Sequence, residues 1–115
     1  MDNKLFFTVI NFSKNNKVTK INSIVKLTKD LDNNYDDEAI LVEMRYIGKI
    51  GYVANSVETV IRGTYSAGRL YDKIMDPDYG KICFVINDKI ICQLLTGDEL
   101  ENEKKDKDSD IHFLQ

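Results

Sequence analysis

The sequence of 115 residues contains no tryptophan, one proline, one histidine and two cysteines. Two cysteines are too few for a disulfide framework, and one histidine does not make a spaced cluster of zinc ligands. That histidine, His112, lies in a charged C-terminal segment, so no base is placed beside a serine or cysteine nucleophile. We therefore expect no catalytic triad, no bound metal and no cofactor.

Long apolar runs are also missing. None approaches the roughly 20 residues that an α-helix needs to cross a bilayer, and the start Met-Asp-Asn-Lys lacks the basic and apolar regions of a signal peptide. We expect a cytoplasmic protein without a membrane partner. The formal net charge of -3 argues against strong sequence-independent attraction to nucleic acid, because that attraction depends on basic side chains.

What is present fits one small globular domain. Hydrophobic residues make up 43% and charged residues 30% of the chain, and its length suits a single core. We divide it into a β-rich domain at residues 1–96 and a charged tail at residues 97–115, which we expect to be mobile. The last five residues of the tail, Ile-His-Phe-Leu-Gln, are apolar again, and here a frayed terminus is favoured over docking.

Runs of β-branched and aromatic residues predict six strands in the first 96 residues. They are expected at residues 4–12, 23–29, 39–46, 50–53, 81–86 and 89–95. Between them the sequence predicts a loop at 13–22, a structured polar loop at 32–37, a two-turn helix at 55–61 and an irregular connection at 64–72. This order predicts a mainly β fold, either a small, strongly curved sheet or a partly open β-barrel with one or two short helices.

The last two expected strands form a hairpin. Asn87 and Asp88 separate them and predict a two-residue turn. Counting outward from that turn places Cys83 opposite Cys92. A reducing cytoplasm favours two free thiols over a disulfide between them.

Two groups of polar residues have side chains of the kind that carry chemistry. The carboxylates of Asp36, Asp37 and Glu38 resemble those that hold metals for phosphodiester chemistry, although solvated turn residues are the commoner explanation for such a loop. The segment Ser66-Ala67-Gly68-Arg69 joins small residues to an arginine that could approach a phosphate. It lacks the spacing of a phosphate-binding loop.

Aromatic residues form a third group. Phe6 and Phe7 alternate in facing on the first expected strand, so one of them faces away from the core and could stack on a base. Tyr35 lies in the polar loop at 32–37. Its ring either folds back to anchor the loop, which is the commoner arrangement, or offers a second stacking surface.

The polar loop and its neighbours resemble the signature of HIRAN domains. That family has a strand leading into an Asn-x-Tyr-Asp-x-x-Ala-Ile segment, which here is residues 33–40, followed by a Gly-Tyr or Gly-His pair, here Gly51-Tyr52. The resemblance runs from about Leu5 to Leu95. Residues 63–73 are further similar to small bacterial stand-alone members.

This resemblance implies a modified OB-like barrel that, in helicase-linked members, holds the 3′ end of single-stranded DNA. In those members a first-strand aromatic and the loop tyrosine stack on terminal bases, and the loop aspartate accepts a hydrogen bond from the 3′ hydroxyl. Carried over to this chain, the stacking pair is Phe6 and Tyr35, and Asn33 and Asp36 make polar contacts. Arg69 is a further candidate for nucleic-acid binding on its own charge, not through the family pattern. A carboxylate repels a phosphate, so Asp36 would favour a free end over a continuing strand.

One position departs from the family pattern. The residue before the first-strand aromatic is basic in DNA-binding members and is Leu5 here. Arg62, Arg69 and Lys73 are the basic residues that could compensate for it. The leading hypothesis is a non-enzymatic module that binds 3′ ends of single-stranded DNA. The alternative is a protein-interaction module of the same fold that binds no nucleic acid, and metal-dependent phosphoryl chemistry at the acidic loop is third.

Overall fold

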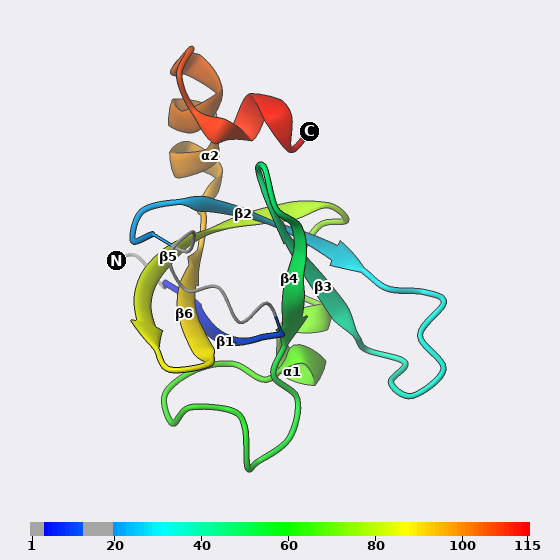
Figure 1. Cartoon of the computed structure of the whole chain (residues 1–115). Coiled ribbons are helices and arrows are strands. Elements are labelled where there is room, and N and C mark those ends of the chain that lie inside the picture. The colour runs from blue at the N-terminus through cyan, green and yellow to red at the C-terminus, as the bar shows by residue number, and fades with distance from the viewer. Residues whose placement is uncertain (1–3, 13–19) are drawn as a thin grey trace.

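The computed structural model describes residues 4–12 and 20–115. Six antiparallel strands form a closed barrel in the order β1-β4-β3-β2-β5-β6 (Figure 1). Their bounds are β1 Phe6–Asn11, β2 Ile24–Lys29, β3 Ile40–Met44, β4 Gly48–Val53, β5 Asp78–Ile86 and β6 Lys89–Leu94. The mainly β barrel is therefore confirmed. Pairing of β1 with both β4 and β6 closes the ring, where the sequence predicted a partly open one.

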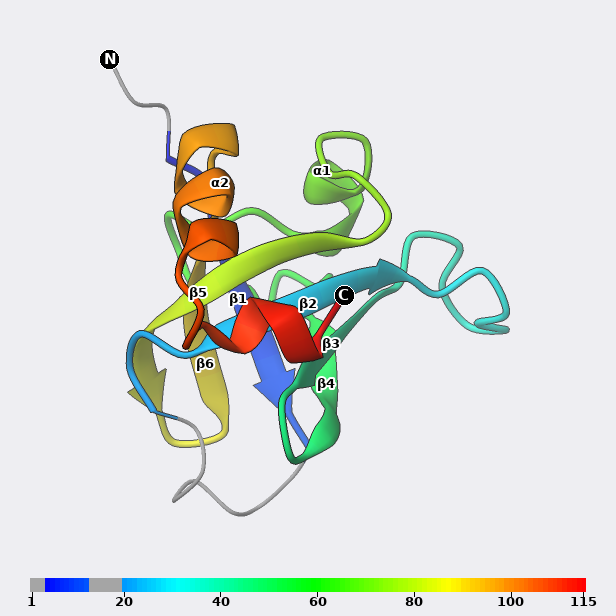
Figure 2. The same ribbon diagram turned by 90° about the horizontal axis from the view of Figure 1, so that it is seen from above.

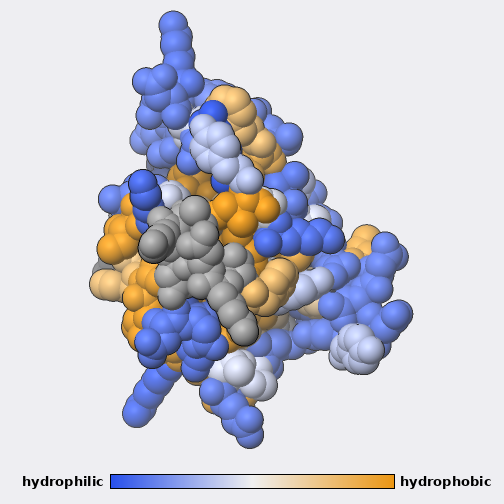
Figure 3. Space-filling model, in the orientation of Figure 1, coloured by the Kyte–Doolittle hydropathy of each residue, from blue (hydrophilic) through white to orange (hydrophobic). Residues whose placement is uncertain are grey.

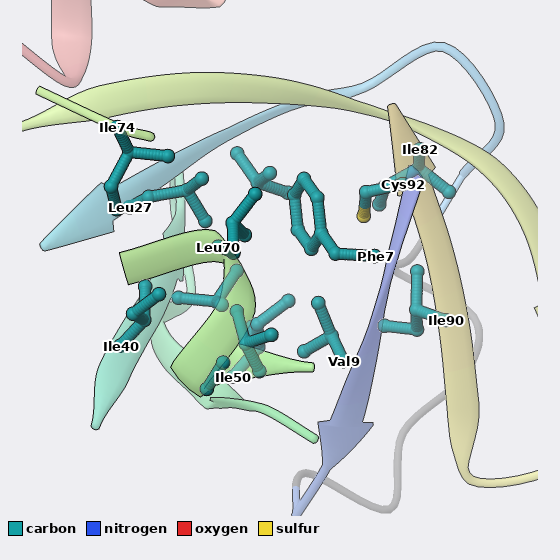
Figure 4. Close-up of a cluster of buried hydrophobic side chains, with 14 of the residues drawn as sticks. Phe7, Val9, Leu27, Ile40, Ile50, Leu70, Ile74, Ile82, Ile90 and Cys92 are labelled. Atoms are coloured by element: carbon teal, nitrogen blue, oxygen red, sulfur yellow. The ribbon is translucent and has the colours of Figure 1, made fainter. Parts of the chain in front are cut away.

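The barrel core follows from the alternation of side chains along the strands. Phe7 and Val9 of β1 and Val25 and Leu27 of β2 are fully buried and face the interior (Figure 4). Phe6 is half-buried on the outer side of β1. Part of the loop expected at 13–22, residues 13–19, lies outside the described residues.

One short helix completes this core, and it lies where the sequence predicted an irregular connection. Helix α1 spans Ala67–Tyr71 and buries Ala67 and Leu70 among the strand side chains (Figure 4). Its N-cap is Ser66, whose Oγ accepts a hydrogen bond from the backbone N–H of Arg69 at 3.3 Å. The buried pair and the cap together explain why a helix forms here.

The prediction of a helix at 55–61 is wrong, because residues 54–66 form turns and bends with no helix among them. Asn55, the expected N-cap, instead makes hydrogen bonds to distant residues of the chain. Val57, which the helical spacing placed on an apolar face, is 97% exposed. Val60 and Ile61, which shared the predicted apolar face with Val57, are half-buried but lie outside any helix.

The β5–β6 hairpin forms as predicted near its turn but not further out. Ile86 pairs with Lys89, and Phe84 pairs with Ile91. A register shift between Ile82 and Phe84 then places Ile82, and not Cys83, opposite Cys92. The extra residue of such a bulge breaks simple counting, and the predicted Cys83 to Cys92 pair is wrong. Both cysteines are free thiols.

The tail has more structure than its composition predicted. Helix α2, Gly97–Lys105, begins at a capping box in which the side chains of Thr96 and Glu99 each accept a backbone hydrogen bond from the other residue. The 3-10 helix η1, Asp110–Phe113, then packs Ile111 against an apolar cluster on the outer side of β2 and β5 (Figures 1 and 2). The expectation of a frayed terminus is wrong, because Ile111 and Leu114 are buried. In the described part of the chain, no helix is long and apolar enough to span a membrane.

Candidate nucleic-acid interface

The β2–β3 loop projects from the side of the barrel and presents a largely hydrophilic surface (Figures 1 and 3). Asn33 organises it, because its Oδ1 accepts hydrogen bonds from the backbone N–H groups of Tyr35 at 2.8 Å and Asp36 at 3.0 Å. Such side-chain turns hold the backbone in one conformation without a regular element. The structured loop expected at 32–37 is therefore present, with Asn33 as its internal support.

Tyr35 does not fold back onto the loop. Its side chain is 98% exposed, so both faces of the ring meet solvent. A tyrosine presented in this way offers a stacking surface whose position is set by the backbone hydrogen bond to Asn33. The loop-anchor interpretation is wrong for this residue.

Asp36 connects the loop to the neighbouring helix. Its Oδ1 accepts from the backbone N–H of Glu38 at 2.8 Å, and its Oδ2 accepts from Nδ2 of Asn55 at 2.9 Å. Oδ1 of Asn55 in turn accepts from the backbone N–H of Gly68 in α1 at 2.8 Å. An ionised carboxylate has about four acceptor positions, so Asp36 can still accept a hydrogen bond from a ligand.

A second set of contacts joins α1 to β1. The guanidinium carbon of Arg69 lies 4.6 Å from the centre of the Tyr65 ring, and Nζ of Lys73 lies 6.0 Å from it. The backbone N–H of Tyr65 donates to the carbonyl of Phe6 at 2.7 Å. Phe6 and Tyr35 thus lie at the two ends of a chain of contacts that passes through Tyr65, α1 and Asn55.

An open pocket of about 390 Å³ lies between residues 54–66 and α1. Its walls include Arg62 and Arg69, two of the three basic residues that the sequence suggested as compensation for Leu5. The remaining lining residues are Asn55, Ser56, Val57, Val60, Thr64 and Ser66. The structure therefore brings together two arginines whose proximity could not be deduced from their spacing.

The third hypothesis placed metal-dependent chemistry on the acidic residues of the loop. Asp37 and Glu38 are exposed, and across residues 4–12 and 20–115 no group of three or more potential metal-ligating side chains is present. A Cβ placed on Gly68 would lie 2.8 Å from Oε1 of Glu38. Glu38 therefore lies against α1, close to the arginine pocket.

Sequence reasoning missed the residue that supports the base of the loop. Asp30 comes immediately after β2, and its Oδ2 accepts a hydrogen bond from the hydroxyl of Tyr52 on β4 at 2.7 Å. This hydrogen bond lowers the pKa of Asp30 and raises the pKa of Tyr52. The Gly51-Tyr52 pair was part of the family signature. The contact of Tyr52 with Asp30 could not be predicted from a local pattern, because the two residues are 22 positions apart.

A small closed barrel of six antiparallel strands, with a short helix in its core and a structured polar loop at its side, defines a class of compact β modules. The model of the HIRAN domain family matches residues 3–93, so the chain belongs to the HIRAN domain family. The crystal structure of the HIRAN domain of human HLTF is similar in fold, with a TM-score of 0.56 and 22% sequence identity over 79% of this chain and 72% of that one. Among curated proteins no match is found.

Proposed function

We propose that this chain is a nucleic-acid-binding module that recognises the 3′ end of single-stranded DNA. The observation that carries the proposal is the pairing of a fully exposed ring, Tyr35, with the carboxylate of Asp36 in a turn that Asn33 holds in place. The family resemblance supports the same residues. Asn33 acts by positioning the other two, since its side-chain oxygen is used within the turn.

Each side chain has a separate task. The Tyr35 ring stacks on a base, an interaction that tolerates any sequence. Asp36 accepts a hydrogen bond from the terminal 3′ hydroxyl and repels a 3′ phosphate. Phe6 offers a second, half-buried ring on β1, and Arg69 supplies positive charge for the backbone. No step of bond making or breaking is involved.

A protein partner is the second candidate. Phe84 and Ile86 are large apolar side chains exposed on the outer side of β5, and exposed apolar clusters mark protein interfaces. The net charge of -3 and the apolar Leu5 both weaken the attraction of the chain for the phosphates of any nucleic-acid strand, which favours a protein partner. An interface centred on β5 would leave Tyr35 and Asp36 unused.

Fluorescence anisotropy at low salt tests the proposal with matched oligothymidylates that end in a 3′ hydroxyl or a 3′ phosphate. Tyr35→Ala should weaken binding by roughly 5-fold to over 100-fold, because base stacking contributes about 1 to 3 kcal/mol. Tyr46→Ala is the matched control, since Tyr46 is 88% exposed on the β3–β4 turn away from the loop. Asp36→Ala should abolish the preference for the 3′ hydroxyl, and Asp36→Asn should reduce it while keeping the side-chain shape.

The alternatives give different results. Absence of affinity for any single-stranded oligonucleotide below millimolar concentration would contradict the proposal and favour a protein partner. Equal affinity for the oligonucleotide with a 3′ hydroxyl and the one with a 3′ phosphate would show that the chain binds single strands without recognising their end.

A further inference from the structure

We infer that the pocket between residues 54–66 and α1 binds a backbone phosphate of the strand whose 3′ end is held by Tyr35 and Asp36. This inference rests on the proposed function and adds to it a specific anion site. The ligand is an internal phosphodiester of single-stranded DNA, and Arg62 and Arg69 are the residues that bind it.

Charge is the first support. Arg62 and Arg69 both line the pocket and both are exposed. Within the part of the chain that the structure describes, the one ion pair joins Arg45 to Asp110, so neither pocket arginine is neutralised by a bound carboxylate. The guanidinium groups are therefore available for charge-assisted hydrogen bonds to phosphate oxygens.

Position is the second support. Asn55 lines the pocket, and its Nδ2 also donates to Oδ2 of Asp36. A single side chain thus separates the carboxylate proposed for the 3′ hydroxyl from the wall of the arginine pocket. A strand that places its terminal hydroxyl at Asp36 must run its backbone away from that point, and the pocket lies directly beside it.

The arginine on α1 is also held in place. Its guanidinium stacks on Tyr65 at 4.6 Å, and Tyr65 is tied to β1 through the hydrogen bond to Phe6. Ser66 accepts from the Arg69 backbone, and its hydroxyl hydrogen remains able to donate into the pocket that it lines. A cation fixed before binding loses less side-chain entropy when the phosphate arrives.

Two acidic residues, Glu38 and Glu58, are neighbours of the pocket residues in space or in sequence. Glu38 lies against Gly68 on one side, and Glu58 is exposed in the segment between Asn55 and Arg62. The negative charge of Glu38, close to Asp36 in the loop, disfavours a phosphate there and favours one beside the two arginines. Glu38→Gln should accordingly strengthen strand binding.

The experiment uses the full chain and an oligothymidylate with a 3′ hydroxyl, titrated over a range of salt concentrations. Arg62→Gln and Arg69→Gln should each weaken binding by roughly tenfold at low salt, and each should reduce the slope of log K against log salt by about 0.7. The control is Lys104→Gln, which removes one positive charge, as each arginine variant does, from an exposed position on α2. It should leave both quantities nearly unchanged.

A neutral methylphosphonate linkage, moved along the oligonucleotide one position at a time, identifies the phosphate. At one position it should weaken binding to the wild-type chain, and this effect should vanish in the double arginine variant. If the wild-type chain binds the 3′ end but the arginine variants bind equally well with an unchanged salt slope, the anion site is wrong and the proposed function stands. If the wild-type chain binds no oligonucleotide, both are wrong.

Discussion

Gly51 on β4 is a position at which the barrel has no room for one more carbon atom. A Cβ built there would lie 1.8 Å from the carbonyl oxygen of Ile10 on β1, at the pairing of β1 with β4. Gly51→Ala should therefore destabilise the fold by about 3 kcal/mol or more, the upper end of the cost of overpacking. Urea unfolding measures the change.

Gly97 provides the matched comparison, because nothing lies within 4 Å of a Cβ at that position. It is the first residue of α2, so Gly97→Ala should be neutral or stabilising by less than about 1 kcal/mol. Equal effects of the two substitutions would show that backbone flexibility, and not the contact with Ile10, is what Gly51 contributes.

Glu99 makes part of the stability depend on pH. Its carboxylate accepts from the backbone N–H of Thr96 at 3.0 Å and from Nε2 of Gln93 at 3.2 Å, and the Thr96 hydrogen bond is the main cause that holds its pKa below the ordinary 4.5. Because the folded pKa is lower than the unfolded one, the charged form stabilises the fold. This contribution is complete above the unfolded pKa and is lost as the pH falls through the folded pKa.

Glu99→Gln tests this assignment, since glutamine can still complete the capping box but carries no charge. At neutral pH the variant should be less stable by about 0.3 to 1 kcal/mol, the usual effect of an acidic residue in the first turn of a helix. Denaturation from neutral pH downward should show the two proteins converging once Glu99 is protonated. A constant difference at every pH would contradict an electrostatic role.

The elements show how far local patterns reach. The β5–β6 turn was predictable because asparagine readily adopts the positive φ that tight hairpin turns require. Asn87 does so in the structure, with a φ of 55°. The bulge between Ile82 and Phe84 was not predictable, because it depends on how β5 bends to pair with both β2 and β6. The position of α1 was missed because it also depends on distant parts of the chain. The helix is stabilised by burial of Ala67 and Leu70 in the core, which no local pattern shows.

The tail illustrates a different limit of sequence reasoning. Helix α2 buries none of its residues, so its charged composition correctly reflects an exposed surface. Order comes from the capping box at its start and from Ile111 and Leu114 beyond its end. A short apolar group after a long charged segment gives no periodic signal, and its partners Ile24, Tyr79 and Leu95 are spread over the chain.

Ile111 should carry much of the docking of this tail. It is fully buried in the apolar cluster on the outer side of β2 and β5, so Ile111→Ala should cost about 2 to 5 kcal/mol if the whole barrel unfolds with the tail. Leu31→Ala is the control, because Leu31 is 78% exposed in the β2–β3 loop. Thermal unfolding compares them, and a similar small shift for both variants would show that the tail detaches without affecting the barrel.

The whole molecule separates the proposed site from its tail. The β2–β3 loop, residues 54–66 and α1 lie to the side and below the barrel in Figure 1, whereas α2 and η1 lie above it. On the tail side, the guanidinium carbon of Arg45 lies 3.4 Å from the centre of the Phe113 ring, and the same guanidinium forms an ion pair with Asp110. The polar loop was predictable from sequence, because its residues are consecutive. The approach of Arg62 to Arg69 required the folded chain.

The net charge of the molecule determines how much a single added cation near the proposed site should matter. A net charge of -3 gives little general attraction for a strand, so each local cation near the site should have a measurable effect. Leu5 precedes the half-buried Phe6 and packs against the edge of the core. The stem of a longer side chain can cover the same apolar surface while its charged end reaches solvent. Leu5→Arg should therefore bind single strands more tightly and steepen the salt dependence by about 0.7 in slope.

Leu5→Gln separates this effect of charge from the loss of leucine packing. Both variants should lose a similar amount of stability, about 1 kcal/mol for a half-buried apolar residue, and Leu5→Gln should leave the salt slope of wild type unchanged. Anisotropy titrations at several salt concentrations, with urea unfolding of the same samples, measure both quantities. Tighter binding by both variants would assign the effect to the loss of leucine. An unchanged slope in Leu5→Arg would show that the strand does not pass the start of β1.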